Sequence, residues 1–434
     1  MSSSKKRYAV VGVGSRSTMY TRAITETYAQ QCELVGLCDT NPARVELRRG
    51  RLPEGYPEVP AYAAGEFDRM VAETRPDVVI VTSMDVTHSD YIVRAMELGA
   101  DVVTEKPMTT DEQRCAAILR TQRRTGRALQ VTFNYRYSPP RSQVRELLAA
   151  DKIGEVLSVD FHWWLDTRHG ADYFRRWHRN RANSGSLLVH KATHHFDLVN
   201  WWLGARPVEV FCMARREFYT PETADDIFGL SGRSERCHTC KLRDKCPFFL
   251  DLEANESLKA MYLDCEGEDG YFRDRCVFSE QIDIWDVMNI SARYDNGVTM
   301  SYSLNAYNPV EGYTIAFNGR RGRLEHLACE STYISGDGSV PGELQKGNVT
   351  VTLIPAFKAP QVIEPRTASG GHGGGDAVLL EDVFNPSPAP DPLKRKAGAL
   401  DGAYSILVGI AACRSIDSGG AVKIADLVDE ELLG

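Results

Sequence analysis

Short apolar runs alternate with amphipathic stretches over the first 130 residues, and this alternation constrains the fold more than any other feature of the chain. The runs are "RYAVVGVG", "CELVGLCD", "DVVIVTS" and "ADVVTEKP", with helical periodicity between them. Strands that alternate with helices form a parallel sheet with crossover connections. We therefore predict an α/β protein whose amino-terminal domain, residues 1–130, is a doubly wound parallel sheet.

From Lys152 onwards the pattern changes to a series of β-rich segments. Several of them alternate with period two, and "YDNGV" contains the Asn-Gly pair of a hairpin turn. We expect residues 131–434 to form a second α/β domain around a large, mostly antiparallel open sheet, with the helical stretch 184–204 packed against it. The Gly- and Pro-rich region from Pro355 to Pro392 is expected to be a long loop or lid.

Size and charge exclude several classes of protein. A chain of 434 residues is long enough for two domains with sizeable cores. Its formal charge of -8 argues against nucleic acid or an anionic membrane as the main partner. We read no export signal at the start and no membrane-spanning run, so we expect a cytoplasmic protein whose 11 cysteines stay reduced.

A glycine turn follows the first predicted strand. Gly12 and Gly14 allow a tight turn and a close approach of the backbone to a pyrophosphate, although Ser17 stands where the usual third glycine is found. Asp39 ends the second strand, where a carboxylate accepts a hydrogen bond from a ribose 2′-hydroxyl. The pair favours NAD, while Arg16 and Arg44 leave NADP open.

The stretch "SGSLLVHKATHHFDLVNWWLG" places three histidines and a lysine in an otherwise apolar helix. His190, His194, Asp197 and Trp201 share one face by helical spacing, and this face is the functional candidate. His195 and Lys191 are expected to point elsewhere, and each can be either a partly buried or surface residue or a substrate contact. The spacing of His190 and His194 also fits a zinc pair, but a lysine follows the first histidine and disfavours a metal.

Four motifs in this order resemble the Gfo/Idh/MocA family of sugar and polyol dehydrogenases: "VVGVGSRS", "SMDVTHSD", "VVTEKP" and "GSLLVHKATHHFDLVNWW". The resemblance covers nearly the whole chain. It implies a Rossmann domain, an open-sheet domain that assembles a homo-oligomer (dimer or tetramer), a catalytic lysine at Lys106 and a catalytic histidine at His194. Many members carry an aspartate where this chain has His190, so their proton relay cannot be copied. We assign cofactor binding to Gly12, Gly14, Ser15, Arg16, Ser17, Asp39, His88, Glu105 and Lys106.

These residues fit hydride transfer from an alcohol. An imidazole can accept the hydroxyl proton, and a lysine ammonium in the same cleft can orient the oxygen, which leaves open whether His194 or Lys106 is the formal base. Donors and aromatic faces suited to a small carbohydrate substrate lie nearby, although each can instead be structural. The predicted substrate-binding residues are His190, Arg136, Tyr137, Arg176, Trp177, His178 and Asp197.

A cysteine cluster, "RCHTCKLRDKC", lies in an insertion at about residues 230–280. Cys237, Cys240 and Cys246 with a fourth cysteine suit a structural zinc, and neighbouring cations such as Arg236 would favour thiolates. Resemblance to relatives with a similar insert favours Cys276 over Cys265. The alternatives are unrelated reduced cysteines or an iron-sulfur cluster.

Three functions remain open. The first is an NAD-dependent dehydrogenase that acts on a secondary hydroxyl of a sugar, cyclitol or glycoside. The second is an enzyme that keeps NAD bound and cleaves a glycosidic bond through transient oxidation, as some relatives in the family do. The segment "GGHGGGD", with His372 and Asp376, is loosely similar to a segment of those relatives. The third is a nucleotide sensor or assembly protein without turnover, which Lys106 and His194 argue against.

Overall fold

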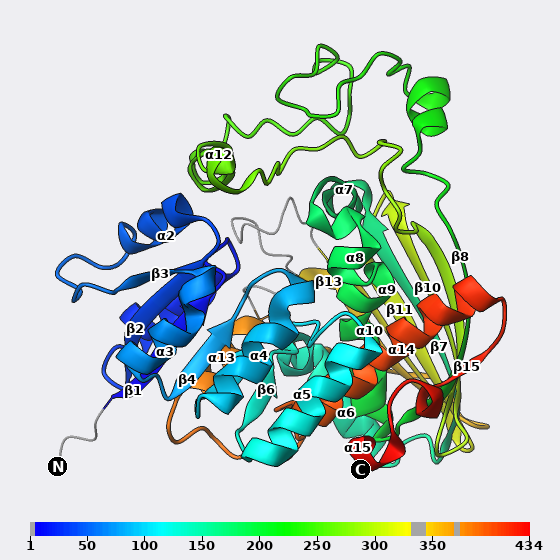
Figure 1. Ribbon diagram of the computed structural model, residues 1–434. Helices are drawn as coiled ribbons and strands as arrows, with labels where there is room; N and C mark the ends of the chain where they lie inside the picture. Colours follow the sequence, from blue (N-terminus) through cyan, green and yellow to red (C-terminus); the bar gives the residue numbers. More distant parts are fainter. Residues whose placement is uncertain (1–4, 331–343, 369–373) are drawn as a thin grey trace.

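The computed structural model describes residues 5–330, 344–368 and 374–434. Its first domain contains a six-stranded parallel sheet in the order β3-β2-β1-β4-β5-β6, the arrangement of a Rossmann domain. Helices lie on both faces of this sheet (Figure 1), which explains why its strands are continuous apolar runs. The strands are β1 (Lys6–Val11), β2 (Cys32–Asp39), β3 (Ala61–Ala63), β4 (Val78–Val81), β5 (Asp101–Thr104) and β6 (Leu129–Val131).

The helices of this domain begin at the carboxyl ends of the strands. Two of them have side-chain caps: Asn41 accepts from the Arg44 amide at the start of α2, and Asp111 accepts from the Arg114 amide at the start of α5. The helices are α1 (Ser17–Arg22), η1 (Ala23–Thr27), α2 (Pro42–Arg49), η2 (Ala64–Glu66), α3 (Phe67–Thr74), η3 (Asp85–Thr87), α4 (His88–Glu97) and α5 (Glu112–Thr125).

The second domain contains a nine-stranded sheet in the order β14-β13-β12-β11-β7-β10-β9-β8-β15. Every neighbouring pair is antiparallel except β7 and β10, which confirms the predicted open sheet. Asn296 and Gly297 form the expected hairpin between β9 and β10, with Gly297 at φ +84°. The strands are β7 (Val156–Asp166), β8 (Pro207–Arg215), β9 (Val287–Tyr294), β10 (Thr299–Asn308), β11 (Glu311–Gly319), β12 (Gly322–Glu330), β13 (Leu344–Pro355), β14 (Gln361–Ile363) and β15 (Val422–Lys423).

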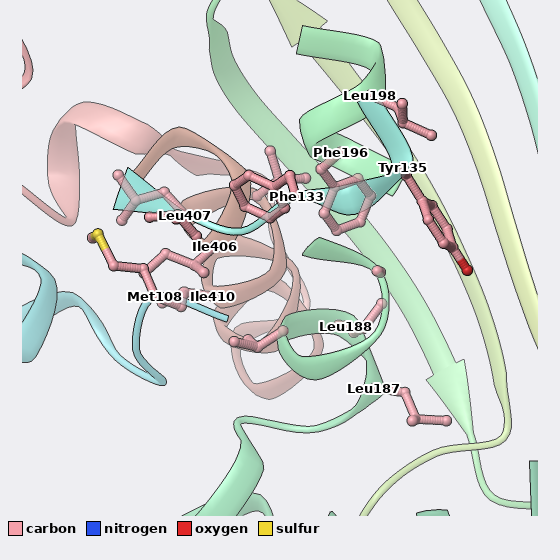
Figure 2. Packing of buried hydrophobic residues seen from close by; sticks show 14 of the residues in the cluster. Met108, Phe133, Tyr135, Leu187, Leu188, Phe196, Leu198, Ile406, Leu407 and Ile410 are labelled. Atoms are coloured by element: carbon pink, nitrogen blue, oxygen red, sulfur yellow. The ribbon is translucent and has the colours of Figure 1, made fainter. Parts of the chain in front are cut away.

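Helices α10 and α14 fill the space between the two sheets. Figure 2 shows Phe133 and Phe196 beside Ile406 and Leu407 in this core. The helices of the second domain are η4 (Asn134–Tyr137), α6 (Pro139–Ala149), α7 (Thr167–Arg175), η5 (Trp177–Arg179), α8 (Arg181–Ser184), α9 (Leu187–His190), α10 (Thr193–Leu203), α13 (Gly375–Phe384), α14 (Ala399–Ser418), η8 (Ile424–Asp426) and α15 (Glu430–Leu433).

The histidine stretch is not one helix, contrary to the sequence prediction. It is broken into α8, α9 and α10, with Lys191 and Ala192 between the last two. Gly185 at φ +67° and Ser186 at φ 82° separate α8 from α9. His190 therefore ends one short helix and His194 lies in the first turn of the next.

Residues 216–286 form an insertion between β8 and β9, two strands that pair directly with each other. Figure 1 shows it crossing from the sheet of the second domain towards α2 of the first. The insertion contains only short helices: η6 (Thr223–Ile227), α11 (Glu256–Leu258), η7 (Lys259–Leu263) and α12 (Glu266–Asp269).

The region from Pro355 to Pro392 was expected to be a long loop or lid, but it contains a helix. It contains α13, which packs against the Rossmann domain through Phe384 and through hydrogen bonds from Tyr28 to Glu381 and from Gln130 to Asp382. His372 lies outside the described residues.

Helix α14 is long and apolar enough to cross a membrane by length and composition, but 72% of its most apolar window is buried inside the protein. It packs on β8, α9 and α10. The apolar composition of α14 is therefore explained by its burial in the core.

Candidate active site

A cavity lies between the two domains. Its volume of about 690 Å³ is within the range that is usual for small-molecule sites. The described residues place most of the predicted site on its wall. From the first domain these are Gly12, Gly14, Ser15, Arg16, Asp39, His88, Glu105 and Lys106, and from the second Arg176, Trp177, His178, His190 and His194.

The glycine turn leaves room for a ligand at one end of the cavity. Gly12 has φ +84°, and a Cβ there would lie 2.4 Å from the Ser83 amide nitrogen, so only glycine fits. A Cβ on Gly14 would meet nothing within 4 Å, which leaves its backbone open to a ligand. Ser17 does not line the cavity, contrary to its assignment. Its hydroxyl donates to the Gly14 carbonyl at 2.8 Å and supports the turn.

Asp39 stands at the same end of the cavity. Its carboxylate accepts from the Val13 amide at 2.6 Å and from the Asn41 amide at 2.9 Å, and the Arg44 guanidinium lies 3.8 Å away. The backbone donors hold Asp39 beside the turn, in the position where a ribose hydroxyl binds in dinucleotide-binding folds.

Glu105 and His88 organise the base of the cavity. Arg16 Nε and the Tyr20 hydroxyl both donate to Glu105 Oε1 at 2.6 Å. Burial acts to raise the pKa of Glu105, but these donors outweigh it and the pKa is lowered. His88 lies 2.8 Å from the Pro107 carbonyl and 3.1 Å from the Ser83 carbonyl, and so joins the loops that follow β4 and β5.

Lys106, His190 and Asp85 form a hydrogen-bonded chain. Lys106 Nζ donates to the His190 carbonyl at 3.1 Å and lies 3.4 Å from His190 Nε2. The other ring nitrogen, Nδ1, lies 2.5 Å from Asp85 Oδ2. Burial lowers the pKa of Lys106 to about 8, against the opposing charge of Asp85. Burial also lowers the pKa of His190 well below its usual value, so its imidazole is neutral at pH 7.

Aromatic rings surround His190. The His178 ring centroid lies 4.2 Å away, that of Tyr173 5.3 Å and that of Trp177 5.9 Å. Burial and the Arg176 charge lower the pKa of His178. Rings around a polar cluster are suited to the apolar faces and hydroxyls of a sugar or cyclitol.

His194 lines the same cavity from α10. Its ring stacks on Tyr135 at 4.3 Å between centroids. Lys191 also lines the cavity, contrary to the expectation that it points elsewhere, and its Nζ donates to the Tyr135 hydroxyl at 3.0 Å. His195 does point away: it stacks on Trp163 and its Nδ1 lies 2.7 Å from the Tyr302 hydroxyl.

Three predicted substrate-binding residues do not line the cavity. Arg136 and Asp197 form a buried ion pair at 2.5 Å, to which Asp401 adds a second carboxylate at 2.9 Å. Burial raises the pKa of Asp197 to about 7 although Arg136 opposes this. Tyr137 donates to Asp382 at 2.9 Å. Arg136 and Asp197 thus connect η4, α10 and α14, and Tyr137 connects η4 to α13.

Sequence reasoning missed several residues of the cavity. Asp85 lies in the motif "SMDVTHSD", three positions before His88. Its place just after β4, at the edge of the sheet where ligands bind, could have marked it as a site residue. The insertion residues carried no such signal. The missed residues are Asp85, Asn134, Tyr135, His169, Asp172, Tyr262, Asp269 and Tyr271. Tyr173, Lys191 and Asp376, which stand out in the sequence, also line the cavity.

The predicted zinc ligands line a second, much smaller cavity of about 20 Å³: Cys237, Cys240, Cys246 and Cys276. Backbone hydrogen bonds from Cys237 to Asp274 and from Cys276 to Glu235 align the two segments, while Cys265 lies elsewhere and donates to the Ala260 carbonyl.

Within the described ranges, no three His, Cys, Asp or Glu side chains converge closely enough to hold a metal ion. Burial raises the pKa of Cys246 and of Cys276. Arg236, expected to favour thiolates, instead pairs with Glu266 and Asp274.

The fold and this cavity define an NAD-binding oxidoreductase. The chain belongs to the Gfo/Idh/MocA oxidoreductase family: its NAD-binding Rossmann pattern matches residues 6–133, and its carboxy-terminal α/β domain pattern matches residues 145–424. The chain is 38% identical to YteT of Bacillus subtilis, which is named as an oxidoreductase, over 97% of this chain and 98% of YteT.

Other relatives match over about half of the chain. The inositol 2-dehydrogenase of Rhizobium meliloti is 28% identical over 48% of this chain and 58% of its own length. The D-glucoside 3-dehydrogenase of Escherichia coli is 27% identical over 47% of this chain and 56% of its own length.

Solved structures share the fold. An oxidoreductase domain protein from Kribbella flavida has a TM-score of 0.65 with 16% identity, over 98% of this chain and 100% of that one. An oxidoreductase from Agrobacterium radiobacter, solved in complex with NAD+, L-tartaric acid and magnesium, has a TM-score of 0.62 with 14% identity, over 98% and 100%.

Proposed function

We propose that this protein is an NAD-dependent dehydrogenase that removes a hydride from a secondary hydroxyl of a sugar, cyclitol or glycoside. One observation carries the proposal: Lys106, with its lowered pKa and its contact to His190, lies in the same cavity as the glycine turn and Asp39. A proton acceptor and a dinucleotide site in one cavity are what alcohol oxidation requires.

The residues present fit NAD. The open backbone at Gly14 suits a pyrophosphate, and the Asp39 carboxylate suits a ribose with a free 2′-hydroxyl. When bound, NAD supplies the hydride acceptor. The negative charge of Asp39 supports NAD rather than NADP.

The protein's own groups handle the proton. The neutral amine of Lys106 accepts the proton from the substrate hydroxyl as the carbon loses its hydride. His190 and Asp85 position that amine through the 3.4 Å and 2.5 Å contacts and stabilise the ammonium that forms. We keep His194 as a candidate base, because it lines the same cavity.

The substrate class follows from the walls of the cavity and from the relatives. Tyr173, Trp177 and His178 offer ring faces and polar edges. The names of two relatives specify inositol and D-glucosides, which are polyhydroxylated rings. This supports a ring-shaped polyol substrate.

A substrate screen tests the proposal. Sugars, cyclitols and aryl glycosides are incubated with the protein and NAD, and NADH absorbance and released aglycone are followed together. NADH formation that disappears in Lys106→Met supports a dehydrogenase. Aglycone release without net NADH supports the second candidate, glycoside cleavage with a recycled cofactor. NAD binding without either reaction across the screen contradicts the proposal and favours a sensor.

We also propose that the protein is a cytoplasmic homo-oligomer that associates through the open sheet. One face of β7, β10 and β11 carries exposed or half-buried polar side chains, such as Asp160, His162 and Ser301. A monomeric mass by light scattering would contradict this.

We further propose that Cys237, Cys240, Cys246 and Cys276 bind a structural zinc ion. The proposal is supported by the shared cavity of the four thiols and by the separate position of Cys265. Zinc binding requires the sulfurs to move to about 2.3 Å from one centre.

A further inference from the structure

The middle of the insertion reaches the dinucleotide end of the cavity. Tyr262, Asp269 and Tyr271 line it together with Gly14 and Asp39. The Tyr262 hydroxyl lies 2.6 Å from the hydroxyl of Ser15 in the glycine turn. The insertion is therefore part of the wall of this cavity.

Several contacts hold the insertion against the first domain. Arg44 Nε donates to the Met261 carbonyl at 3.1 Å, and Asn41 Nδ2 donates to the Cys265 carbonyl at 2.8 Å. Leu47 of α2 packs on an apolar cluster of the insertion, formed by Leu252, Leu258, Met261 and Tyr262. On the opposite side, Arg273 pairs with Asp172 of α7 at 2.6 Å, and both side chains are buried.

Arg44 is shared between two carboxylates. Its Nη1 lies 2.9 Å from Asp269 and 3.8 Å from Asp39; the side chains of Arg44 and Asp39 are buried, and that of Asp269 is 14% exposed. Arginine beside a ribose binds a 2′-phosphate when its guanidinium is available. Here Nε and Nη1 of the guanidinium are already paired, with the Met261 carbonyl and with Asp269, and within the described residues Nη2 alone has no hydrogen-bond partner. Arg44 and the two carboxylates together carry a net negative charge. Of the other cations nearby, Arg48 donates to the Gly14 carbonyl and Arg16 pairs with Glu105.

We propose that Asp269 of the insertion is a cofactor-specificity residue, which acts with Asp39 to exclude a 2′-phosphate by occupying Arg44. Tyr262 anchors the same segment over the glycine turn. The insertion thereby selects NAD over NADP and slows the release of the bound dinucleotide. This inference rests on the proposed use of NAD, but it concerns binding rather than turnover.

The test is a titration of the full-length protein with NAD and with NADP, followed by stopped-flow displacement of bound NADH. Asp269→Asn should lower the ratio of the NADP to the NAD dissociation constant by about 10-fold, since one nearby charge is removed. Tyr262→Phe, which loses the contact to Ser15, should release NADH several-fold faster. Asp264→Asn is the matched control: its exposed carboxylate lies in the same insertion and pairs only with Lys259.

Unchanged ratios and release rates in both variants, with circular dichroism like that of the parent, would overturn the inference. If Asp269→Asn unfolds, Arg44→Gln tests the same arrangement, because a neutral side chain there should leave NADP excluded. A gain in NADP affinity in Arg44→Gln contradicts the inference. Failure of the proposed function is distinguishable, since it appears as NAD binding without substrate oxidation.

Discussion

His190 Nδ1 lies 2.5 Å from Asp85 Oδ2, and the opposite ring nitrogen of His190 faces Lys106. Asp85 follows a strand of the Rossmann sheet, whereas His190 ends a helix of the second domain. The contact therefore couples the two domains at the place where a proton acceptor is needed.

Asp85→Asn should weaken turnover and shift its pH dependence. The negative charge of Asp85 raises the pKa of Lys106, so its removal should lower that pKa and move the kcat profile to lower pH. A hydrogen bond to a charged group contributes about 1.5–3 kcal/mol, so kcat should fall about 10- to 100-fold. Asp68→Asn, at an exposed pair with Arg94, is the control. A profile identical to that of the parent would show that Asp85 has only a structural role.

The pH dependence of the parent enzyme follows from Lys106. Its pKa is lowered to about 8, so the neutral amine accumulates as pH rises through that value. The kcat for alcohol oxidation should therefore rise with pH and level off above about pH 8, while carbonyl reduction, which needs the ammonium, should fall. Steady-state rates in both directions measure this. An oxidation rate that falls between pH 7 and 9 contradicts Lys106 as the base.

Lys106→Met and His194→Ala should each retain the fold and most of the NAD affinity. The kcat of each variant should fall about 10²-fold or more, because a general acid or base typically contributes about 10²- to 10⁴-fold. The double variant should lose less than the product, because the groups act together. His190→Asp introduces the aspartate that the family resemblance leads us to expect at this position, and it should alter the pH profile without abolishing the reaction. Near-normal turnover in His194→Ala, with loss in His190→Ala, would reassign the histidine role to His190.

Asp39→Ala should narrow the preference for NAD. In the parent, NAD should bind about 10-fold or more tightly than NADP, a difference of ~1.4 kcal/mol. The carboxylate is held towards the cavity by the Val13 and Asn41 amides, so its removal should weaken NAD and strengthen NADP. Calorimetric titration with both dinucleotides measures the ratio. Equal affinities in the parent would refute the assignment.

Protein purified without added zinc should contain about one zinc ion per chain. Cys276→Ser should lose it, while Cys265→Ser, whose thiol lies outside the small cavity, should retain it. Chelation should expose residues 216–286 to protease before the first domain unfolds, because metal binding and local folding are coupled. Mass spectrometry under native conditions measures the content. An absence of stoichiometric metal would leave four ordinary thiols.

The sequence by itself determined the two-domain architecture, the glycine turn with Asp39, and Lys106 at the end of its strand. These features depend on local periodicity and on turn chemistry, and both can be read over a few residues. In a parallel sheet the carboxyl ends of the strands share one edge, so the positions of Gly12, Asp39 and Lys106 followed from the strand pattern.

Only the tertiary structure decided which side chains meet. Asp85 and His190 are 105 positions apart, and Ser15 and Tyr262 are 247 apart. Asp197 lies on the same helix as His194 but pairs with Arg136 of η4 instead of lining the cavity, and a helical wheel does not show which partner a face will meet. The insertion has little regular structure, so its place over the dinucleotide site comes from packing and ion pairs with distant residues, which local propensity does not encode.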